Sequence, residues 1–138
     1  MGKDPIPQGM YKPAVRFGSL IFTAGMTPRK DGVLLYAGQI GPETDLEACR
    51  GAVRQAAENA LTAALNCLSE GETLQILSLT VYVNAAPGFT AHPKVGDMAS
   101  EYLSEKLGSC GIGPRAAVGA ASLPGNAPVE VQLVAGVR

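Results

Sequence analysis

The sequence predicts an α+β fold in a single domain that spans residues 1–138. Three observations lead to this fold class. Runs with a two-residue apolar period alternate with runs of three- and four-residue period, which are the patterns of strands and helices. The expected order is strands, helix, strand, helix and two strands, and this order places both helices on one face of a sheet. A length of 138 residues is typical of one domain, and no linker or internal repeat divides the chain.

Two strands are expected near the N-terminus, after a segment rich in proline and glycine. The apolar run 20–24 predicts one strand, and residues 14–17 predict another that pairs with it across Gly18-Ser19, a pair that suits a hairpin turn. Asp31-Gly32 indicates a second turn, followed by a short strand over residues 33–36.

A long helix is predicted from Thr44 to about residue 68. Residues 44–47 have the pattern of a capping box, in which the Thr44 hydroxyl accepts from the amide of Glu47 while the Glu47 carboxylate reaches back. Apolar residues then recur at steps of three and four, and Gly71 lies just past the expected end. Most residues of this stripe are alanine, which allows close packing against a sheet.

A strand over residues 74–83 and a second helix should follow. Alternation in the strand predicts that one face carries the core residues Leu77, Leu79, Val81 and Val83 and that the other carries Ile76, Ser78, Thr80 and Tyr82. The second helix is expected to begin near His92-Pro93, because proline suits a first turn, and to end at about Leu107 before a run of glycines.

The C-terminal part predicts two further strands, over residues 116–121 and 129–137. In the last strand the residues expected on the core face are Val129, Val131, Leu133 and Ala135. Glu130 and Gln132 face the other way. Both helices are therefore expected on the face that carries the valines.

The composition indicates a thin core that another subunit completes. The chain has 17 glycines, four tyrosines, three phenylalanines and no tryptophan, and alanine is frequent, so little apolar area is available per residue. The sheet face away from the helices is expected to carry Ile76, Tyr82 and Val134 among polar residues. A half-apolar surface of this kind is usually covered by a partner.

Charge and metal-ligating residues exclude several function classes. A net charge of −1 with scattered lysines and arginines gives no basic patch for nucleic acid. One histidine and three cysteines, separated by 18 and 43 residues, match no metal-site pattern, and an odd cysteine count suits reduced thiols. Residues 1–6 lack a signal-peptide pattern and no apolar run reaches the length of a membrane span. We therefore expect a cytoplasmic protein with no metal, nucleic-acid or membrane partner.

Arg115 and Glu130 are the candidates for chemistry. Arg115 follows a Gly/Pro run and precedes an uncharged strand, a position where a guanidinium can hold a carboxylate through two hydrogen bonds. Glu130 is the only acid after Arg115 and could orient or deprotonate a water. The alternatives for Arg115 are a surface arginine or a structural ion pair. The alternatives for Glu130 are a solvated strand residue or an ion-pair partner of Arg115. His92 is expected to be a cap or an exposed side chain, because it precedes a proline at the start of a helix. A Ser-His-Asp triad is not expected, since the sequence has no Gly-x-Ser-x-Gly segment.

Four stretches of the chain resemble the RidA, or YjgF-type, family of reactive-intermediate deaminases. They are Gly9-Met10-Tyr11, the strand and turn from Leu20 to Thr27-Pro28, Asn59-Ala60-Leu61, and the segment from Pro114-Arg115 through Ser122-Leu123-Pro124 to Val129-Glu130. The separation of 15 residues between Arg115 and Glu130 is that of the family. The segment 89–113 looks more like a divergent branch formerly labelled endoribonuclease L-PSP-like.

The resemblance implies a chorismate-mutase-like mixed sheet with two helices on one face, and a homotrimer with sites in the clefts between subunits. It implies that Arg115 binds the carboxylate of a small 2-imino or enamine acid and that Glu130 positions the attacking water. Tyr11 would line the pocket, and the backbone at Gly25 and Ala117 would contact the ligand. Hydrolysis to a 2-oxo acid and ammonia would then need no metal or organic cofactor.

The sequence departs from the family pattern at several positions near this site. Ala24 stands where the family usually has serine, Ala116 and Ala117 stand where serine and cysteine are frequent, and Pro114 directly precedes the arginine. These changes remove side-chain hydrogen bonds and keep a second hypothesis open, a non-catalytic trimer that binds small carboxylates. Ribonuclease activity, attached to some relatives, is a third, and the charge balance gives it no support.

Overall fold

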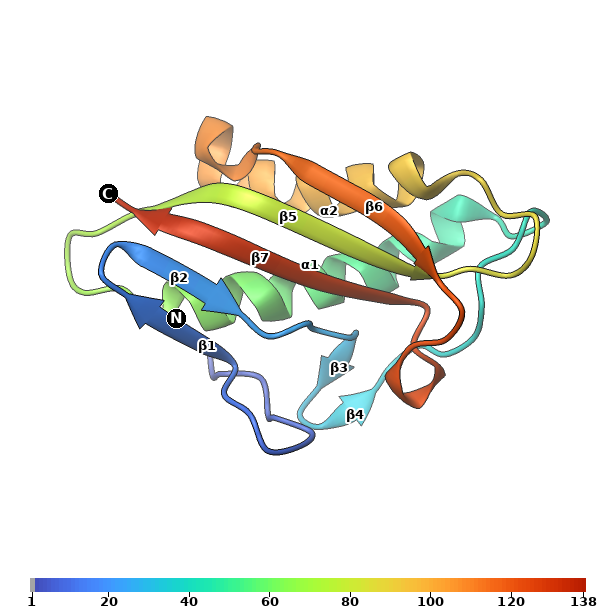
Figure 1. Cartoon of the computed structure of the whole chain (residues 1–138), viewed down its shortest axis with the longest axis horizontal. Helices are drawn as coiled ribbons and strands as arrows, with labels where there is room; N and C mark the ends of the chain where they lie inside the picture. Colours follow the sequence, from blue (N-terminus) through green and yellow to red (C-terminus); the bar gives the residue numbers. More distant parts are fainter. Residues whose placement is uncertain (1) are drawn as a thin grey trace.

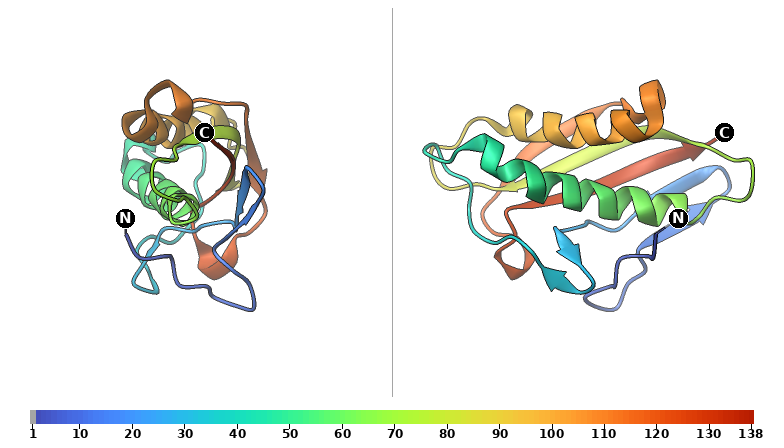
Figure 2. Two further views of the ribbon diagram at one scale, coloured as in Figure 1. Left: turned by 90° about the vertical axis from the view of Figure 1, so that its left-hand side faces the viewer. Right: turned by 180° about the vertical axis from the view of Figure 1, so that it is seen from behind.

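A computed structural model describes residues 2–138 and shows a five-stranded mixed sheet with two helices on one face (Figures 1 and 2). The strand order is β1-β2-β7-β5-β6; β5 and β6 are parallel, and the other neighbours are antiparallel. The strands of this sheet are β1 (Ala14–Phe17), β2 (Leu20–Thr23), β5 (Leu74–Asn84), β6 (Arg115–Ala120) and β7 (Val129–Val137). The predicted α+β class and the placement of both helices are confirmed.

The N-terminal strands form two hairpins. β1 and β2 pair across the predicted turn, where Gly18 has a φ of 64° that favours glycine. β3 (Arg29–Lys30) and β4 (Val33–Leu34) form a separate two-stranded sheet across Asp31-Gly32, whose φ values of 53° and 81° are those of a tight hairpin turn. The strand predicted over residues 33–36 is therefore only two residues long.

Within residues 2–138, two α-helices and three short 3-10 turns complete the fold. α1 (Arg50–Leu65) follows the 3-10 turn η1 (Leu46–Cys49), and it ends three residues before the predicted position. α2 (His92–Leu107) has the predicted limits, with proline in its first turn. η2 (Gly108–Gly111) follows α2, and η3 (Pro124–Asn126) lies between β6 and β7.

The capping box predicted at Thr44 is wrong. Asp45 caps the first turn, because its Oδ1 accepts the amide hydrogen of Glu47 over 3.1 Å. The Thr44 hydroxyl instead accepts from the amide of Gly41 over 2.8 Å. The Glu47 carboxylate does not reach back and pairs with Arg50, which holds the pKa of Glu47 below its ordinary value. Thr44-Asp45 offers two possible caps in succession, and the second one is used.

A β-bulge in β5 changes which residues face the core. Ile76 pairs with Ala135 and Ser78 pairs with Val134, so Leu77 is an extra residue without a partner. As a result Ile76 is only 2% exposed and Leu77 is 39% exposed, the reverse of the prediction from strict alternation. Beyond the bulge the predicted core residues are buried, namely Leu79, Val81 and Val83.

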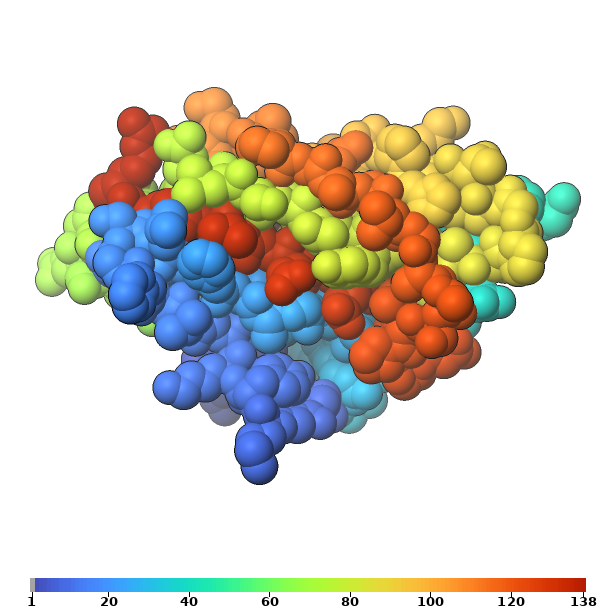
Figure 3. Space-filling model, in the orientation of Figure 1, coloured from blue at the N-terminus to red at the C-terminus, as the bar shows by residue number. Residues whose placement is uncertain are grey.

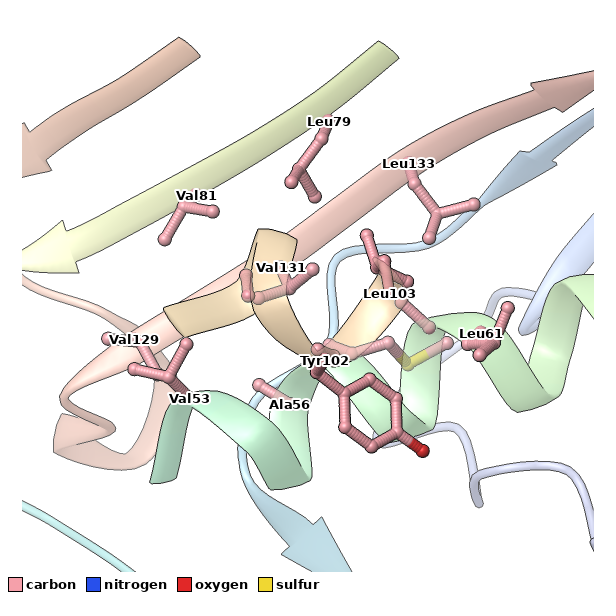
Figure 4. Close-up of a cluster of buried hydrophobic side chains, with 14 of the residues drawn as sticks. Val53, Ala56, Leu61, Leu79, Val81, Tyr102, Leu103, Val129, Val131 and Leu133 are labelled. Atoms are coloured by element: carbon pink, nitrogen blue, oxygen red, sulfur yellow. The ribbon is translucent and has the colours of Figure 1, made fainter. Parts of the chain in front are cut away.

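The core lies between the sheet and the two helices (Figure 4). The α1 face toward the sheet consists mainly of small side chains, with Ala56, Ala57 and Ala60 fully buried. They pack in one cluster with the buried β7 valines and with Tyr102 and Leu103 of α2. Small residues let the helix lie close to the sheet.

The other face of the sheet is open and carries exposed apolar side chains. Figures 1 and 3 view the molecule from this side, with the helices behind the sheet. Phe17 is 82% exposed, and Val15, Leu20, Phe22 and Val118 are exposed as well. Ile76, expected here from the sequence, lies in the core instead, while Tyr82 and Val134 are on this face. None of the helices in residues 2–138 is both long and apolar enough to cross a membrane.

Candidate functional site

Arg115 and Ala117 lie on the helix-covered face of the sheet. Both belong to β6, the edge strand that runs parallel to β5, and they pair with Leu79 and Val81. Paired residues of neighbouring strands point to the same face, and Leu79 and Val81 are buried beneath the helices. The Arg115 side chain therefore extends toward α2.

Helix α2 holds the Arg115 guanidinium through three polar contacts. Nη1 donates to Asp97 Oδ1 over 2.8 Å and to Ser100 Oγ over 3.1 Å, and Nη2 donates to the Pro93 carbonyl over 3.2 Å. The Arg115 side chain is 23% exposed, whereas that of Asp97 is 62% exposed. The guanidinium is thus fixed at the edge of the sheet and still reaches solvent.

Gly96 makes this close contact between α2 and β6 possible. A methyl group on Gly96 would lie 3.0 Å from Arg115 Cζ and Nε and 3.2 Å from the Ala117 methyl. Glycine within a helix costs about 1 kcal/mol relative to alanine. Here the missing side chain provides the space in which the guanidinium lies. We refer to Pro93, Gly96, Asp97, Ser100, Arg115 and Ala117 as the Arg115 cluster.

Glu130 lies on the open face of the sheet, beside Tyr82 of β5. The side chain is half-buried, and this burial raises the pKa of the Glu130 carboxyl. The carboxylate lies directly over Gly25: a methyl group on Gly25 would collide with it and would lie 3.1 Å from Cγ. The structure therefore brings together two of the predicted site residues, Gly25 and Glu130.

Tyr11 and Gly25 line a cavity of about 390 Å³ between the N-terminal segment and α1. The Tyr11 hydroxyl accepts from the amide of Gln8 over 3.0 Å, which orients the ring. On the far wall, Asn59 of α1 donates to the carbonyls of Thr27 and Arg29 over 3.1 and 2.7 Å. Asn59 thus fixes the chain that follows Gly25. We refer to Gly25 and Glu130 as the Glu130 cluster; Tyr11 shares the cavity with Gly25, and Glu130 is not among the residues that line it.

The two clusters do not meet within one chain. Their side chains point to opposite faces of the sheet, and β5 lies between the strands that carry Arg115 and Glu130. Two strand spacings and a three-residue offset along the strands place the two Cα atoms about 14 Å apart. A small 2-imino acid cannot touch both side chains of the same subunit.

Sequence reasoning missed Gly96, Asp97 and Ser100, the α2 residues of the Arg115 cluster. The sequence does contain a signal for these three residues. Asp97 and Ser100 are three residues apart and so share one face of the predicted helix. Gly96 precedes them in the middle of that helix, where glycine is unfavourable unless something packs against it.

The remaining candidate residues have structural contacts. His92 is the first residue of α2, and its ring lies 4.9 Å from the ring of Phe89 in an edge-on arrangement. All three cysteines, Cys49, Cys67 and Cys110, are free thiols. Across residues 2–138, no group of three or more His, Cys, Asp or Glu side chains could hold a metal ion.

The sequence of residues 5–137 matches the family model described as "YjgF/chorismate mutase-like, putative endoribonuclease". The chain belongs to this family. Among the relatives of this YjgF-like chain, protein TCP17 of Trypanosoma cruzi is 29% identical over 127 residues, which cover 91% of this chain and 79% of TCP17. A RutC family protein of Pyrococcus abyssi is 28% identical over 135 residues, 96% of this chain and 91% of that protein.

A solved structure extends the likeness to the whole fold. A "putative endoribonuclease" of Shewanella oneidensis is 31% identical and superposes with a TM-score of 0.85, covering 98% of this chain and 90% of that one. The resemblance to the RidA and YjgF-type family and its chorismate-mutase-like fold is thereby confirmed.

Proposed function

We propose that this YjgF-like protein hydrolyses small 2-imino or enamine acids to 2-oxo acids and ammonia, in clefts between the subunits of a homotrimer. The observation that carries the proposal is the division of the site into the Arg115 cluster and the Glu130 cluster on opposite faces of one chain. A ring of identical subunits brings unlike surfaces of neighbouring copies together. The Arg115 cluster of one subunit would then face the Glu130 cluster of the next.

The chemistry needs only groups that these clusters contain. The guanidinium of Arg115 would hold the substrate carboxylate through charge-assisted hydrogen bonds. The Glu130 carboxylate would accept a proton from water as the water oxygen adds to the imine carbon, and would pass that proton to the nitrogen, which gives an amino alcohol. It would then move the proton of the new hydroxyl to the amino group, so that the C–N bond breaks and the 2-oxo acid and ammonia are formed. Burial raises the pKa of Glu130 and so makes it a better proton acceptor than an exposed carboxylate.

A first test measures turnover with 2-aminoacrylate generated in the assay by a coupled enzyme. We expect the wild-type protein to hydrolyse the imine well above the spontaneous rate. In both Arg115→Ala and Glu130→Gln the rate should fall to the spontaneous one. A wild-type rate equal to the spontaneous rate, or an undiminished Arg115→Ala variant, contradicts the proposal.

Subunit mixing tests where the site is built. Co-expression of Arg115→Ala with Glu130→Gln should restore part of the activity, because some clefts of the mixed trimers combine the intact arginine of one subunit with the intact glutamate of the other. Each variant alone should remain inactive. If mixing restores nothing although both variants trimerise, the site does not lie between subunits.

A non-catalytic trimer that binds small carboxylates is the second candidate, favoured by the alanines at positions 24, 116 and 117. Its signature would be binding of a 2-oxo acid that depends on Arg115, without any turnover. Ribonuclease activity, suggested by the family description, would need RNA cleavage that survives raised salt. A cytoplasmic location stays a prediction.

A further inference from the structure

Arg115, the proposed anchor for the substrate carboxylate, already binds the carboxylate of Asp97 in its own chain. The two hydrogens of Arg115 Nη1 have two acceptors, Asp97 Oδ1 at 2.8 Å and Ser100 Oγ at 3.1 Å. The Pro93 carbonyl takes one hydrogen of Nη2 at 3.2 Å. A guanidinium has five N–H donors, so the Nε hydrogen and one Nη2 hydrogen are left for a ligand.

We propose that Asp97 is a positioning residue that lowers the affinity of Arg115 for carboxylate ligands, so that the site fills only at raised ligand concentration. The inference rests on the proposed role of Arg115 as carboxylate anchor. Asp97 acts through Arg115 and does not touch the ligand.

The geometry allows ligand and Asp97 to occupy the guanidinium together. Gly96 lies against Cζ and Nε on the α2 side, and Asp97 and Ser100 occupy Nη1. A ligand carboxylate therefore approaches a guanidinium whose plane and position are already fixed, and it does not have to displace the three contacts. Fixed geometry reduces the entropy that binding would otherwise cost.

The charge of Asp97, in contrast, lowers the affinity for a ligand carboxylate. With Asp97 in place, the ligand meets a guanidinium whose charge is already neutralised, and two carboxylates on one guanidinium repel each other. Asp97 is 62% exposed, so water screens this repulsion. Exposed pairs of charges have modest energies, and the expected effect on affinity is about two- to fivefold.

The experiment titrates wild type and Asp97→Asn with pyruvate, followed by calorimetry or by NMR of the protein. Asparagine keeps an oxygen that can accept from Nη1 and removes only the charge. We expect Asp97→Asn to bind pyruvate about two- to fivefold more tightly than wild type at low salt, and we expect this difference in affinity to narrow as salt is raised. In the turnover assay the same variant should have a lower KM at an unchanged kcat.

The matched control is Glu101→Gln. Glu101 lies one helical turn after Asp97 on α2 and pairs with Arg50 rather than with Arg115. The Glu101→Gln substitution removes the same charge from the same helix and should leave the affinity for pyruvate unchanged. Asp97→Ala, which removes charge and acceptor together, should also bind more tightly than wild type. Gly96→Ala should weaken binding, because its methyl group displaces the guanidinium.

Weaker or equal binding by both Asp97 variants would overturn the inference and would leave Asp97 a purely supporting residue. An equal gain in Glu101→Gln would also overturn it, since net charge alone would then explain the effect. The inference would also be overturned if neither wild type nor the variants bind pyruvate at concentrations up to millimolar. If wild type shows no turnover but Asp97→Asn binds pyruvate more tightly than wild type, the result contradicts the deaminase proposal and leaves this inference standing.

Discussion

Missing side chains create both halves of the candidate site. Gly25 leaves room for the Glu130 carboxylate on the open face, and Gly96 leaves room for the Arg115 guanidinium on the helix face. In each case the absence of a Cβ lets the polar group lie against the backbone of the glycine. Sequence reasoning identified Gly25 through the family pattern, but the role of Gly96 depends on how close α2 comes to β6.

The raised pKa of Glu130 leads to a prediction about stability. An acid whose pKa is raised by folding gives its full contribution to stability at low pH and loses part of it as the pH rises through the folded-state pKa. Glutamine carries no charge and does not suffer this loss. We therefore expect Glu130→Gln to have a higher Tm than wild type near neutral pH.

Thermal unfolding of both proteins from about pH 4 to about pH 7 checks this expectation. The Tm difference between Glu130→Gln and wild type should shrink toward the acid end. A difference that does not change with pH would show that burial does not penalise the Glu130 charge.

At the scale of the elements, hydrogen bonds and an ion pair join the β1-β2 hairpin to the loop between α1 and β5. Arg16 of β1 binds Glu72 through two hydrogen bonds of 2.7 and 2.9 Å, and its Nη1 also donates to the Cys67 carbonyl. The amide of Ser69 donates to the same carboxylate over 2.7 Å. Hydrogen bonds from the Arg16 guanidinium and from this amide lower the pKa of Glu72 to about 2.

Replacement of Glu72 by glutamine should therefore destabilise the protein in a pH-dependent way. An acid with a lowered pKa stabilises the fold above its unfolded-state pKa, and this contribution disappears as the pH falls toward 2. We expect Glu72→Gln to have a lower Tm than wild type at neutral pH, with the two values converging on acidification. Glu70→Gln, an exposed neighbour, serves as control and should follow wild type throughout.

Periodicity predicted most elements of this fold but could not predict a break in a period. The limits of α2 and β7 follow from the sequence, because proline and alternating valines are local signals. The bulge at Leu77 exchanges the roles of Ile76 and Leu77, and it depends on pairing with β7 rather than on residues nearby. The site has the same limitation: Arg115 and Glu130 are predicted from their positions beside and within apolar strands, whereas the contact of Asp97 with Arg115 depends on where α2 lies over β6.

At the scale of the whole molecule, the open face is the surface expected to meet other subunits. Phe17, Leu20 and Phe22 are exposed there on the β1-β2 hairpin, next to β7. The thin alanine-rich core on the other face leaves the sheet with apolar side chains on both sides. Burial of the open face against neighbouring copies would complete the fold and would join the two clusters.

Light scattering tests this assembly directly. Wild type is expected at three times the chain mass of 14.2 kDa, and Phe22→Asp should reduce the mass toward a single chain. Val33→Asp places the same charge on an exposed apolar position of β4, outside the main sheet, and should remain trimeric. A monomeric wild-type protein at micromolar concentration refutes the trimer.

Helix α2 is also the connection between the parallel strands β5 and β6. Every residue that holds the Arg115 guanidinium therefore belongs to one uninterrupted stretch, 93–115. The exposed phenylalanines and Glu130 lie outside that stretch, near the two ends of the chain. Substitutions within this single crossover can therefore alter the setting of the guanidinium while the exposed side chains of the open face stay the same.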